Sequence, residues 1–324
     1  MANSGIQEGI ERCFTGLAQE ARELFLDSGV PVLERTPPPL EFYRSYVAPN
    51  KPVVLSDFTA SWHALHKWNH RYFRQVIGDL QVTVAVTPNG YADAVTDGYF
   101  VMPEERQMMV NQFLDIMEEP GSAQGVFYVQ KQNSNLTEEF QTVMGDVETL
   151  SAWGTQVFGT SCTQVFGKAP DAVNMWIGDG RAVTSMHRDH YENLYSVVSG
   201  SKTFLLIPPS DLPFVPYESY PAAHYKEVNG QFVIEPDEEG AQVPWIAVDP
   251  LSPDVARYPQ YANCRPVEVT VHAGQTLYLP SLWFHHVRQS HACVAVNLWY
   301  DMEFDIKYNY YKFVESVAQL VRKH

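Results

Sequence analysis

The segment DAVNMWIGDGRAVTSMHRDHYENLYSVVSGSKTFLLIPP, residues 171–209, decides the fold class. In it, short runs rich in Val, Tyr, Leu and Trp are separated by Gly, Pro and Ser turns. The same texture continues after residue 266 in VEVTVHAG, TLYLP, WFHHV and CVAVNLWY. Many short strands between such turns are typical of sandwiches, jelly rolls and barrels. From about residue 170 onward the sequence therefore predicts a mainly β domain.

Helical spacing marks both ends of the chain. Apolar residues recur every three or four positions from Ile6 to Leu24, which predicts a one-sided helix over roughly residues 4–27. The proline run in RTPPPLEFYRSYV ends that helix and begins a short second one. Residues 308–323 predict a C-terminal helix, whose apolar side contains Tyr311, Val314, Val317 and Val321.

The residues between these ends predict an N-terminal extension followed by the β core. Strand patterns occur in KPVVLSD (51–57), LQVTVAVTP (80–88) and GVFYVQKQ (125–132), and helical spacing occurs over residues 108–118. We therefore expect three parts: an extension of helices and strands over residues 1–124, a β core over 125–304 and a helix over 305–324.

Two irregular segments interrupt the predicted core. Residues 208–265 form a long Pro- and acid-rich insert, and a loop of that size inside a compact β domain is usually a lid or a binding segment. The word TQVFG occurs at 155–159 and again at 163–167. Two copies of five residues are too short for a repeat architecture, so we interpret them as a local duplication that lengthens a loop.

The charge balance and the cysteines limit the partners and the compartment. With 38 acidic and 22 basic residues, the net charge is -16, which argues against nucleic-acid binding and is compatible with Lys- or Arg-containing peptides. Four scattered cysteines without a C-x-x-C motif favour a reducing compartment. Neither a signal-peptide pattern nor a membrane-spanning apolar stretch is visible. We expect a cytoplasmic and nuclear protein without membrane contact.

A His-x-Asp pattern in the quoted segment is the candidate metal site. His187 and Asp189 are two residues apart, so on a strand both side chains project to the same side of the sheet. Chance predicts roughly one His-x-[Asp/Glu] in a chain of this composition, and a second copy follows at 190–192, so the pattern alone is not specific. A later predicted strand supplies His285 and His286, which cannot both face one metal.

The setting of this pattern resembles a known family. VTSMHRDHYENLY (183–195), a lysine fifteen residues after the first histidine, LYLPSLWFHHV (277–287) and VAVNLWY (294–300) follow one another as in the JmjC-domain 2-oxoglutarate oxygenases. The resemblance covers nearly the whole chain. It implies a mainly β (α+β) fold, in which a double-stranded β-helix (jelly-roll, cupin-like) core carries an N-terminal extension of helices and strands and a C-terminal helix.

The resemblance also implies the site residues. In the family, the last iron ligand comes two residues after a tryptophan, which selects His285 after Trp283. The expected Fe(II) ligands are thus His187, Asp189 and His285. The residues expected to bind the cosubstrate 2-oxoglutarate are Lys202, which pairs with its far carboxylate, the hydroxyl donors Tyr128 and Thr184, and the pocket-lining Asn193 and Asn297. Trp299 matches a wall of the active site. From spacing alone, a lysine after a turn would lie in solvent, and Tyr128 and Trp299 would lie in the core.

The implied function is Fe(II)- and 2-oxoglutarate-dependent protein oxygenation, with O2 as the second cosubstrate. PNGYADAV (88–95), YVQKQ (128–132) and ARYP (256–259) resemble a lysyl-hydroxylase member of the family. That resemblance implies a (3S)-lysyl hydroxylase acting on developmentally regulated GTP-binding proteins. Lysine demethylase, histone-tail endopeptidase and a catalytically silent cupin-like binding module are the alternatives. Family members of this size pair through C-terminal helices, so residues 305–322 either form a homodimer contact or pack on their own domain.

A lysyl target also requires a group that holds its ammonium. An acidic or aromatic pocket would do so. Tyr91 and Asp93 in GYADAV are candidates for this contact, but we favour a solvated loop for both.

Overall fold

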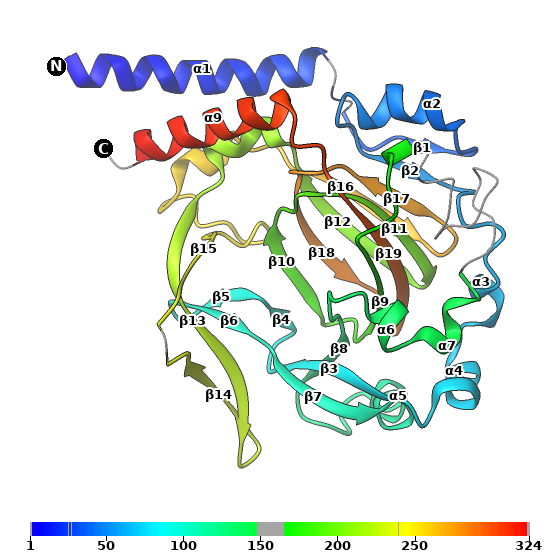
Figure 1. Cartoon of the computed structure of the whole chain (residues 1–324). Helices are drawn as coiled ribbons and strands as arrows, with labels where there is room; N and C mark the ends of the chain where they lie inside the picture. Colours follow the sequence, from blue (N-terminus) through cyan, green and yellow to red (C-terminus); the bar gives the residue numbers. More distant parts are fainter. Residues whose placement is uncertain (1, 25, 27, 148–164, 239, 323–324) are drawn as a thin grey trace.

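The computed structural model describes residues 2–24, 26, 28–147, 165–238 and 240–322 (Figure 1). The first TQVFG copy and the first two residues of the second copy lie outside the described residues. The interpretation of this duplication as a lengthened loop therefore stays a prediction.

Eight strands of the C-terminal half form a jelly roll of two antiparallel four-stranded sheets that face each other (Figure 1). Their cluster of buried side chains lies between the sheets and includes Trp176, Tyr195, Phe204 and Val287. The predicted jelly-roll core is therefore confirmed. In spatial order, one sheet contains β9 (Ala172–Gly178), β19 (Cys293–Asp301), β11 (Tyr191–Ser199) and β17 (Thr276–Leu279), and the other contains β10 (Val183–His187), β18 (Phe284–Gln289), β12 (Ser201–Ile207) and β16 (Val267–His272).

Five strands that precede the jelly roll in the chain enlarge the first sheet to nine strands. β1 (Val32–Leu33) and β2 (Val53–Leu55) add to the β17 edge, and β8 (Val126–Val129), β3 (Gln81–Thr87) and β7 (Glu104–Met109) add to the β9 edge. The short helices of the extension are α2 (Pro39–Phe42), continued as a π-helix over Tyr43–Val47, α3 (Ala64–Lys67), α4 (His70–Ile77) and α5 (Val110–Glu118). β8 and the short helices α6 (Asn135–Glu138) and α7 (Gln141–Met144) lie beyond residue 124, in the part predicted as core. The predicted strands at 51–57, 80–88 and 125–132 and the helix at 108–118 are confirmed.

Alternation along the strands of the nine-stranded sheet separates two cores. In β11, Tyr195 packs between the jelly-roll sheets, whereas Leu194 and Val198 join the cluster on the other face. That second cluster contains Phe73 of α4 and Phe113 of α5, so the extension covers this face of the sheet. The extension thus shares the nine-stranded sheet with the jelly roll and builds a second core on its outer face.

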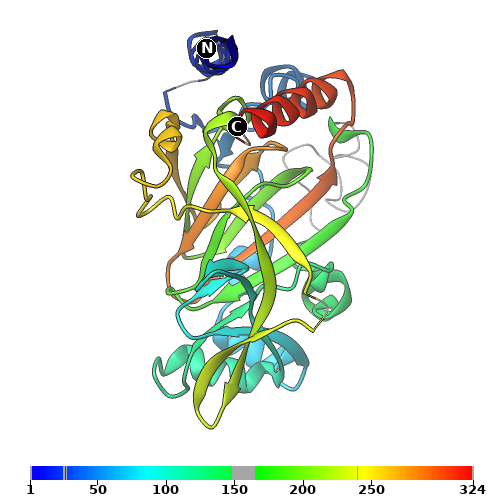
Figure 2. The ribbon, with the colours of Figure 1, turned by 90° about the vertical axis from the view of Figure 1, so that its left-hand side faces the viewer.

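The insert at 208–265 contains three β-strands and two 3-10 helices, so the expectation of one long loop is wrong. β13 (Tyr217–Val228) crosses the molecule (Figure 2) and pairs with β14 (Gln231–Pro236), β15 (Gln242–Ile246) and β6 (Tyr99–Met102), which pairs with β5 (Ala94–Thr96). Two 3-10 helices, η2 (Pro209–Phe214) and η3 (Pro259–Asn263), flank these strands. Pro221 hides β13 in the sequence, because proline lacks the N–H that a central strand needs. It lies where the partner of β13 changes from β15 to β14.

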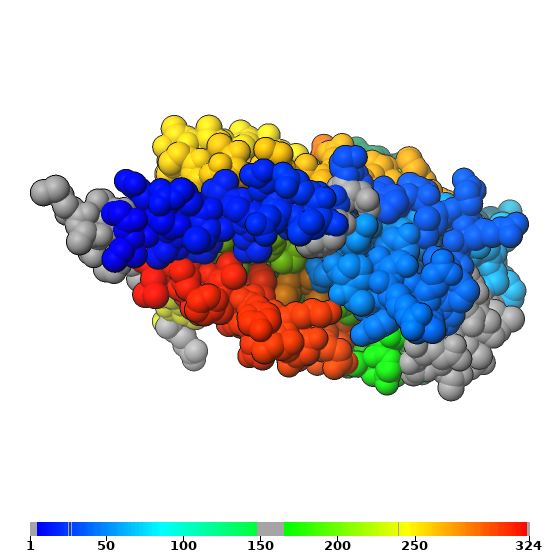
Figure 3. All heavy atoms as spheres, turned by 90° about the horizontal axis from the view of Figure 1, so that it is seen from above, coloured from blue at the N-terminus to red at the C-terminus, as the bar shows by residue number. Residues whose placement is uncertain are grey.

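The two terminal helices lie side by side (Figures 1 and 3). α1 (Ala2–Leu24) and α9 (Ile306–Arg322) share a cluster that includes Phe14, Ala18, Tyr311 and Ala318, and both helices pack on η2. Both predicted helices are confirmed. The apolar side of α9 packs on its own domain. Among the described residues, no helix combines the length and the apolar character that crossing a bilayer requires.

Candidate metal centre

The metal-site candidates meet where β10 and β18 pair. In this antiparallel pair His187 lies opposite His285, and Thr184 lies opposite Val287. Three residues of β10 therefore match two of β18, which is a β-bulge. On a regular strand, residues three apart face opposite sides of the sheet. The bulge turns Thr184 and His187 toward the same side, between the two sheets.

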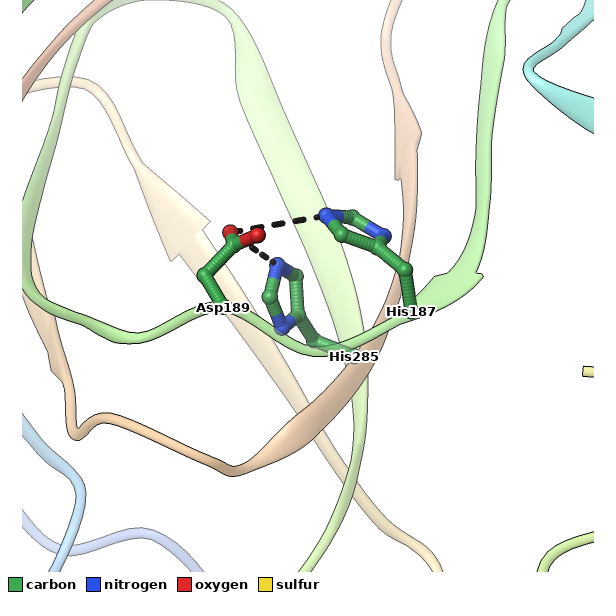
Figure 4. A group of neighbouring side chains, drawn as sticks. All are labelled: His187, Asp189 and His285. Carbon is green, nitrogen blue, oxygen red and sulfur yellow. Dashed lines mark ion pairs between the residues drawn. The ribbon is translucent and has the colours of Figure 1, made fainter. Parts of the chain in front are cut away.

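Three donor atoms converge at this point (Figure 4). Asp189 Oδ2 lies 3.6 Å from His187 Nε2 and 3.6 Å from His285 Nε2. All three donor atoms lie within 4.8 Å of one another. The backbone N–H of Leu282 donates to the carbonyl oxygen of Asp189 at 2.8 Å. This bond holds Asp189, two residues beyond the end of β10, against the segment that leads into β18.

The remaining ring nitrogens fix the orientation of both imidazoles. Nδ1 of His187 lies 2.8 Å from the carbonyl oxygen of Ser185, and Nδ1 of His285 lies 3.0 Å from that of Trp283. A carbonyl oxygen only accepts, so each Nδ1 donates, and in the neutral ring the lone pair is left on Nε2. Two imidazoles and one carboxylate are the donor set of the non-haem Fe(II) oxygenases. The residues therefore fit a ferrous ion.

The ionisation of the three side chains also suits a metal. Burial opposes ionisation of Asp189, but His187 and His285 outweigh it and lower the pKa of Asp189 to about 2. Burial and the neighbouring His187 lower the pKa of His285 to about 4. For His187, burial lowers the pKa, but Asp189, the Ser185 carbonyl and Asp93 together raise it above its usual value. At neutral pH the carboxylate is charged and His285 is neutral, as metal binding requires.

Lys202 lies in the core between the two jelly-roll sheets. The residue is only 1% exposed, and its Nζ donates to the Tyr128 hydroxyl at 2.7 Å and to Gln289 Oε1 at 2.6 Å. Burial lowers the pKa of Lys202 from 10.5 to about 8. No carboxylate of the described residues pairs with this ammonium. A buried cation with neutral partners only is costly, so the position fits an anionic ligand such as the far carboxylate of 2-oxoglutarate.

Gln289 was missed by the sequence analysis. It lies opposite Lys202 in the register of β12 and β18, and its side-chain amide also donates to the Asp179 carbonyl oxygen at 3.0 Å. Neither spacing nor residue type distinguishes this glutamine from a surface residue. Only the strand register could have found it.

The two predicted asparagines lie in one buried network. Asn297 Nδ2 donates to Asn193 Oδ1 at 3.2 Å, and the Trp176 indole N–H donates to Asn297 Oδ1 at 2.8 Å. Trp299 is two residues beyond Asn297, stacks on Tyr191 with ring centroids 5.0 Å apart, and its buried indole N–H has no hydrogen-bond partner in the described structure. These residues share the side of β19 and β11 that faces the opposite sheet. That an indole N–H is left unpaired there is consistent with a ligand site.

Three neighbours of the ligand candidates do not join the metal group. His286 points away from His285, is 1% exposed, and both of its ring nitrogens lack a hydrogen-bond partner among the described residues. His190 contacts the aromatic rings of Phe304 and Tyr308. Glu192 accepts hydrogen bonds from Tyr278 and Ser281.

Asp93 contradicts the expectation of a solvated loop. It is half-buried at the bend between β4 (Tyr91–Ala92) and β5, and β4 pairs with β10. Burial raises the pKa of Asp93 to about 6, and the nearby His187 opposes this effect. Asp93 lines a cavity of about 690 Å³. The Tyr91 hydroxyl donates instead to Asp249 at 3.1 Å, so of the two only Asp93 both lines this cavity and lies near His187.

Comparison with known proteins supports the same family. Residues 39–306 match the family model described as "Cupin-like domain". The chain is 49% identical over 300 residues to the Homo sapiens protein named bifunctional peptidase and (3S)-lysyl hydroxylase JMJD7, covering 92% of each chain. It is 40% identical to the Arabidopsis thaliana lysine-specific demethylase JMJ32, covering 93% of this chain and 90% of the relative.

A third relative, JmjC domain-containing protein E of Dictyostelium discoideum, is 32% identical, and the alignment covers 94% of this chain and 93% of the relative. The agreement of the family model, the near full-length relatives and the jelly-roll core confirms the resemblance seen in the sequence. The chain belongs to the cupin-like JmjC family.

Proposed function

We propose that this chain is an Fe(II)- and 2-oxoglutarate-dependent oxygenase that hydroxylates a lysyl residue of a protein. The observation that supports it best is the combination of a His-Asp-His group with a buried ammonium that has no carboxylate partner in the described structure. A metal site alone would also suit other cupins. A cation buried between the sheets has a purpose only if a small dianion binds beside the metal.

The residues of this chain divide the work. His187, Asp189 and His285 would hold the iron. Lys202 and the hydroxyls of Tyr128 and Thr184 would bind the far carboxylate of 2-oxoglutarate. When bound, iron and 2-oxoglutarate supply the oxidising power that inserts one oxygen atom of O2 into a C–H bond. Trp176 and Tyr195 are the buried aromatic residues around Lys202, and they exclude water from that pocket.

The substrate class follows from the relatives and from the charge. The human relative is named as a lysyl hydroxylase and peptidase, and the Arabidopsis relative as a lysine-specific demethylase. The net charge of -16 favours a cationic partner. We propose a lysine of a developmentally regulated GTP-binding protein as the target, hydroxylated at its 3-position with S configuration, in the cytoplasm and nucleus.

The first experiment tests the metal and cosubstrate site. Under anaerobic conditions, Fe(II) is added to the purified protein, then 2-oxoglutarate, and the visible metal-to-ligand charge-transfer band is recorded. We expect a band in the parent and in His272→Ala, an exposed histidine on β16 of the same sheet as two of the ligands, and none in His187→Ala. No band in the parent would leave only a cupin-like binding module.

The second experiment separates the possible reactions. Peptides covering the lysines of the GTP-binding protein are incubated with the loaded protein and analysed by mass spectrometry. A single added oxygen on lysine supports hydroxylation. Formaldehyde released from methylated copies would indicate demethylation instead, and cleaved backbone would indicate endopeptidase activity.

A homodimer is also part of the proposal. α9 packs one side on its own domain through Tyr311 and Ala318, while Tyr310 and Phe313 on other sides of the helix are 65% and 67% exposed. Exposed aromatic residues of this size are typical of contact surfaces. We propose that α9 pairs two copies.

A further inference from the structure

Asp93 is held beside the metal group by its backbone. The residue has a left-handed backbone conformation with φ of 53°, which is uncommon for a residue other than glycine and marks a bend that aims the side chain. The Ser185 hydroxyl donates to the Asp93 carbonyl oxygen at 2.6 Å. The carbonyl oxygen of the same Ser185 accepts from Nδ1 of the ligand candidate His187 at 2.8 Å. One residue of β10 therefore fixes both Asp93 and His187.

Trp245 of β15 belongs to the same arrangement. Its indole N–H donates to the Ser185 hydroxyl at 3.2 Å. Its ring lies nearly parallel to the His187 imidazole, with 8° between the planes and 6.3 Å between the centroids. Phe100 supports the indole, with ring centroids 4.6 Å apart. The indole of Trp245 and the backbone carbonyl of Asp93 thus both bond to the Ser185 hydroxyl, next to His187.

The carboxylate of Asp93 is available for a ligand. Asp93, Glu104 and Glu105 are the carboxylates in the lining of the 690 Å³ cavity. Glu104 pairs with Arg106 at 2.6 Å, and Glu105 is exposed and lies 3.7 Å from the Lys131 ammonium. Within the part of the chain that the structure describes, the side chain of Asp93 forms no hydrogen bond or ion pair. Asp93 is therefore the half-buried acid of this wall without an ion-pair partner in the described structure, although Lys131, His224 and Lys226 also line the cavity and His187 lies nearby.

We propose that Asp93 binds the ε-ammonium of the substrate lysine and so selects lysine over neutral side chains. This inference rests on the proposed function. The reacting carbon and the ammonium are joined by a flexible apolar stem, so a lysine whose stem lies at the metal needs an acid close to the metal to hold its charged end. A side chain without the ammonium would leave the carboxylate desolvated and unpaired, and this penalty provides the selection.

The test compares two peptides on two variants. One peptide contains the modified lysine of the protein substrate, and the other has norleucine, which has a similar stem without the ammonium, at that position. Asp93→Asn keeps the size of the side chain, and asparagine tolerates the left-handed conformation. Asp97→Asn is the matched control, because Asp97 is an exposed aspartate of the same small sheet with φ of 50°. Peptide affinity is measured by fluorescence anisotropy without O2, and oxygen addition is measured by mass spectrometry.

The parent and Asp97→Asn should bind the lysine peptide on the order of 10- to 100-fold more tightly than the norleucine peptide, the range typical of a hydrogen-bonded charge. In Asp93→Asn the ratio should fall to about threefold or less. A parent that binds both peptides equally, or neither, overturns the inference, as does an unchanged ratio in Asp93→Asn. If lysine receives no oxygen from the parent, the proposed function falls and the inference with it. If it does receive oxygen but the ratio in Asp93→Asn is unchanged, the inference alone falls.

Discussion

Lys202→Met replaces the buried ammonium by an apolar side chain of similar length. In the parent, burial lowers the Lys202 pKa from 10.5 to about 8. Each pKa unit corresponds to about 1.4 kcal/mol, so holding the proton in the folded chain costs about 3 kcal/mol at neutral pH. The substitution removes this cost but leaves the Tyr128 hydroxyl and Gln289 Oε1 without their donor, which costs about 1–3 kcal/mol. Without cosubstrate, the variant should be as stable as the parent, or up to about 2 kcal/mol more stable.

The difference in stability should depend on pH within one window. Lys202 titrates near 10.5 in the unfolded chain and near 8 in the folded chain. Between these values the unfolded chain holds more protons, so the parent gains stability as pH rises. Below the folded pKa both states hold the proton, and the cost is constant. Relative to Lys202→Met, the free energy of unfolding of the parent should therefore rise by about 3 kcal/mol across the window.

Cosubstrate should reverse the order of stability. A charged hydrogen bond contributes about 1.5–3 kcal/mol, so the variant should bind 2-oxoglutarate about 10- to 100-fold more weakly. Urea denaturation with and without Fe(II) and 2-oxoglutarate measures both effects. Lys307→Met, an exposed lysine of α9, is the control and should change neither. The reasoning is refuted if Lys202→Met is several kcal/mol less stable without cosubstrate at neutral pH, or if it binds 2-oxoglutarate as tightly as the parent.

Arg322→Met should lower the free energy of unfolding by about 2–4 kcal/mol. The reason is that the guanidinium donates to three backbone carbonyls in and just after η2, at 2.6 to 3.1 Å. An unchanged urea midpoint would contradict this. Fe(II) affinity should fall as the pH falls through the raised pKa of His187, because a protonated imidazole cannot bind metal. A charge-transfer titration that does not vary with pH would count against the site. Phe313→Ser should halve the mass measured by light scattering if α9 pairs two copies, and a parent with the mass of one chain would exclude the dimer.

The sequence predicted the elements whose signals are local. α1 and α9 have apolar residues every three or four positions, and β3 alternates over its whole length, so each pattern is complete within one segment. The jelly-roll texture and the order of the His-x-Asp motif, the lysine and the later histidines were likewise visible along the chain. Where a local signal was broken, prediction failed: Pro221 made the longest strand resemble a loop.

The sequence by itself therefore determined which residue types are present for a ferrous site and on which predicted strands they lie. Tertiary structure decided their geometry. The bulge before His187, the pairing of Lys202 with Gln289 and the burial of Asp93 beside Ser185 all depend on which strands become neighbours and in what register. Pairing of distant strands is set by the packing of the whole core and leaves no periodic trace in either segment. For this reason the chemistry of the site could be predicted from the chain, and the charge balance around it could not.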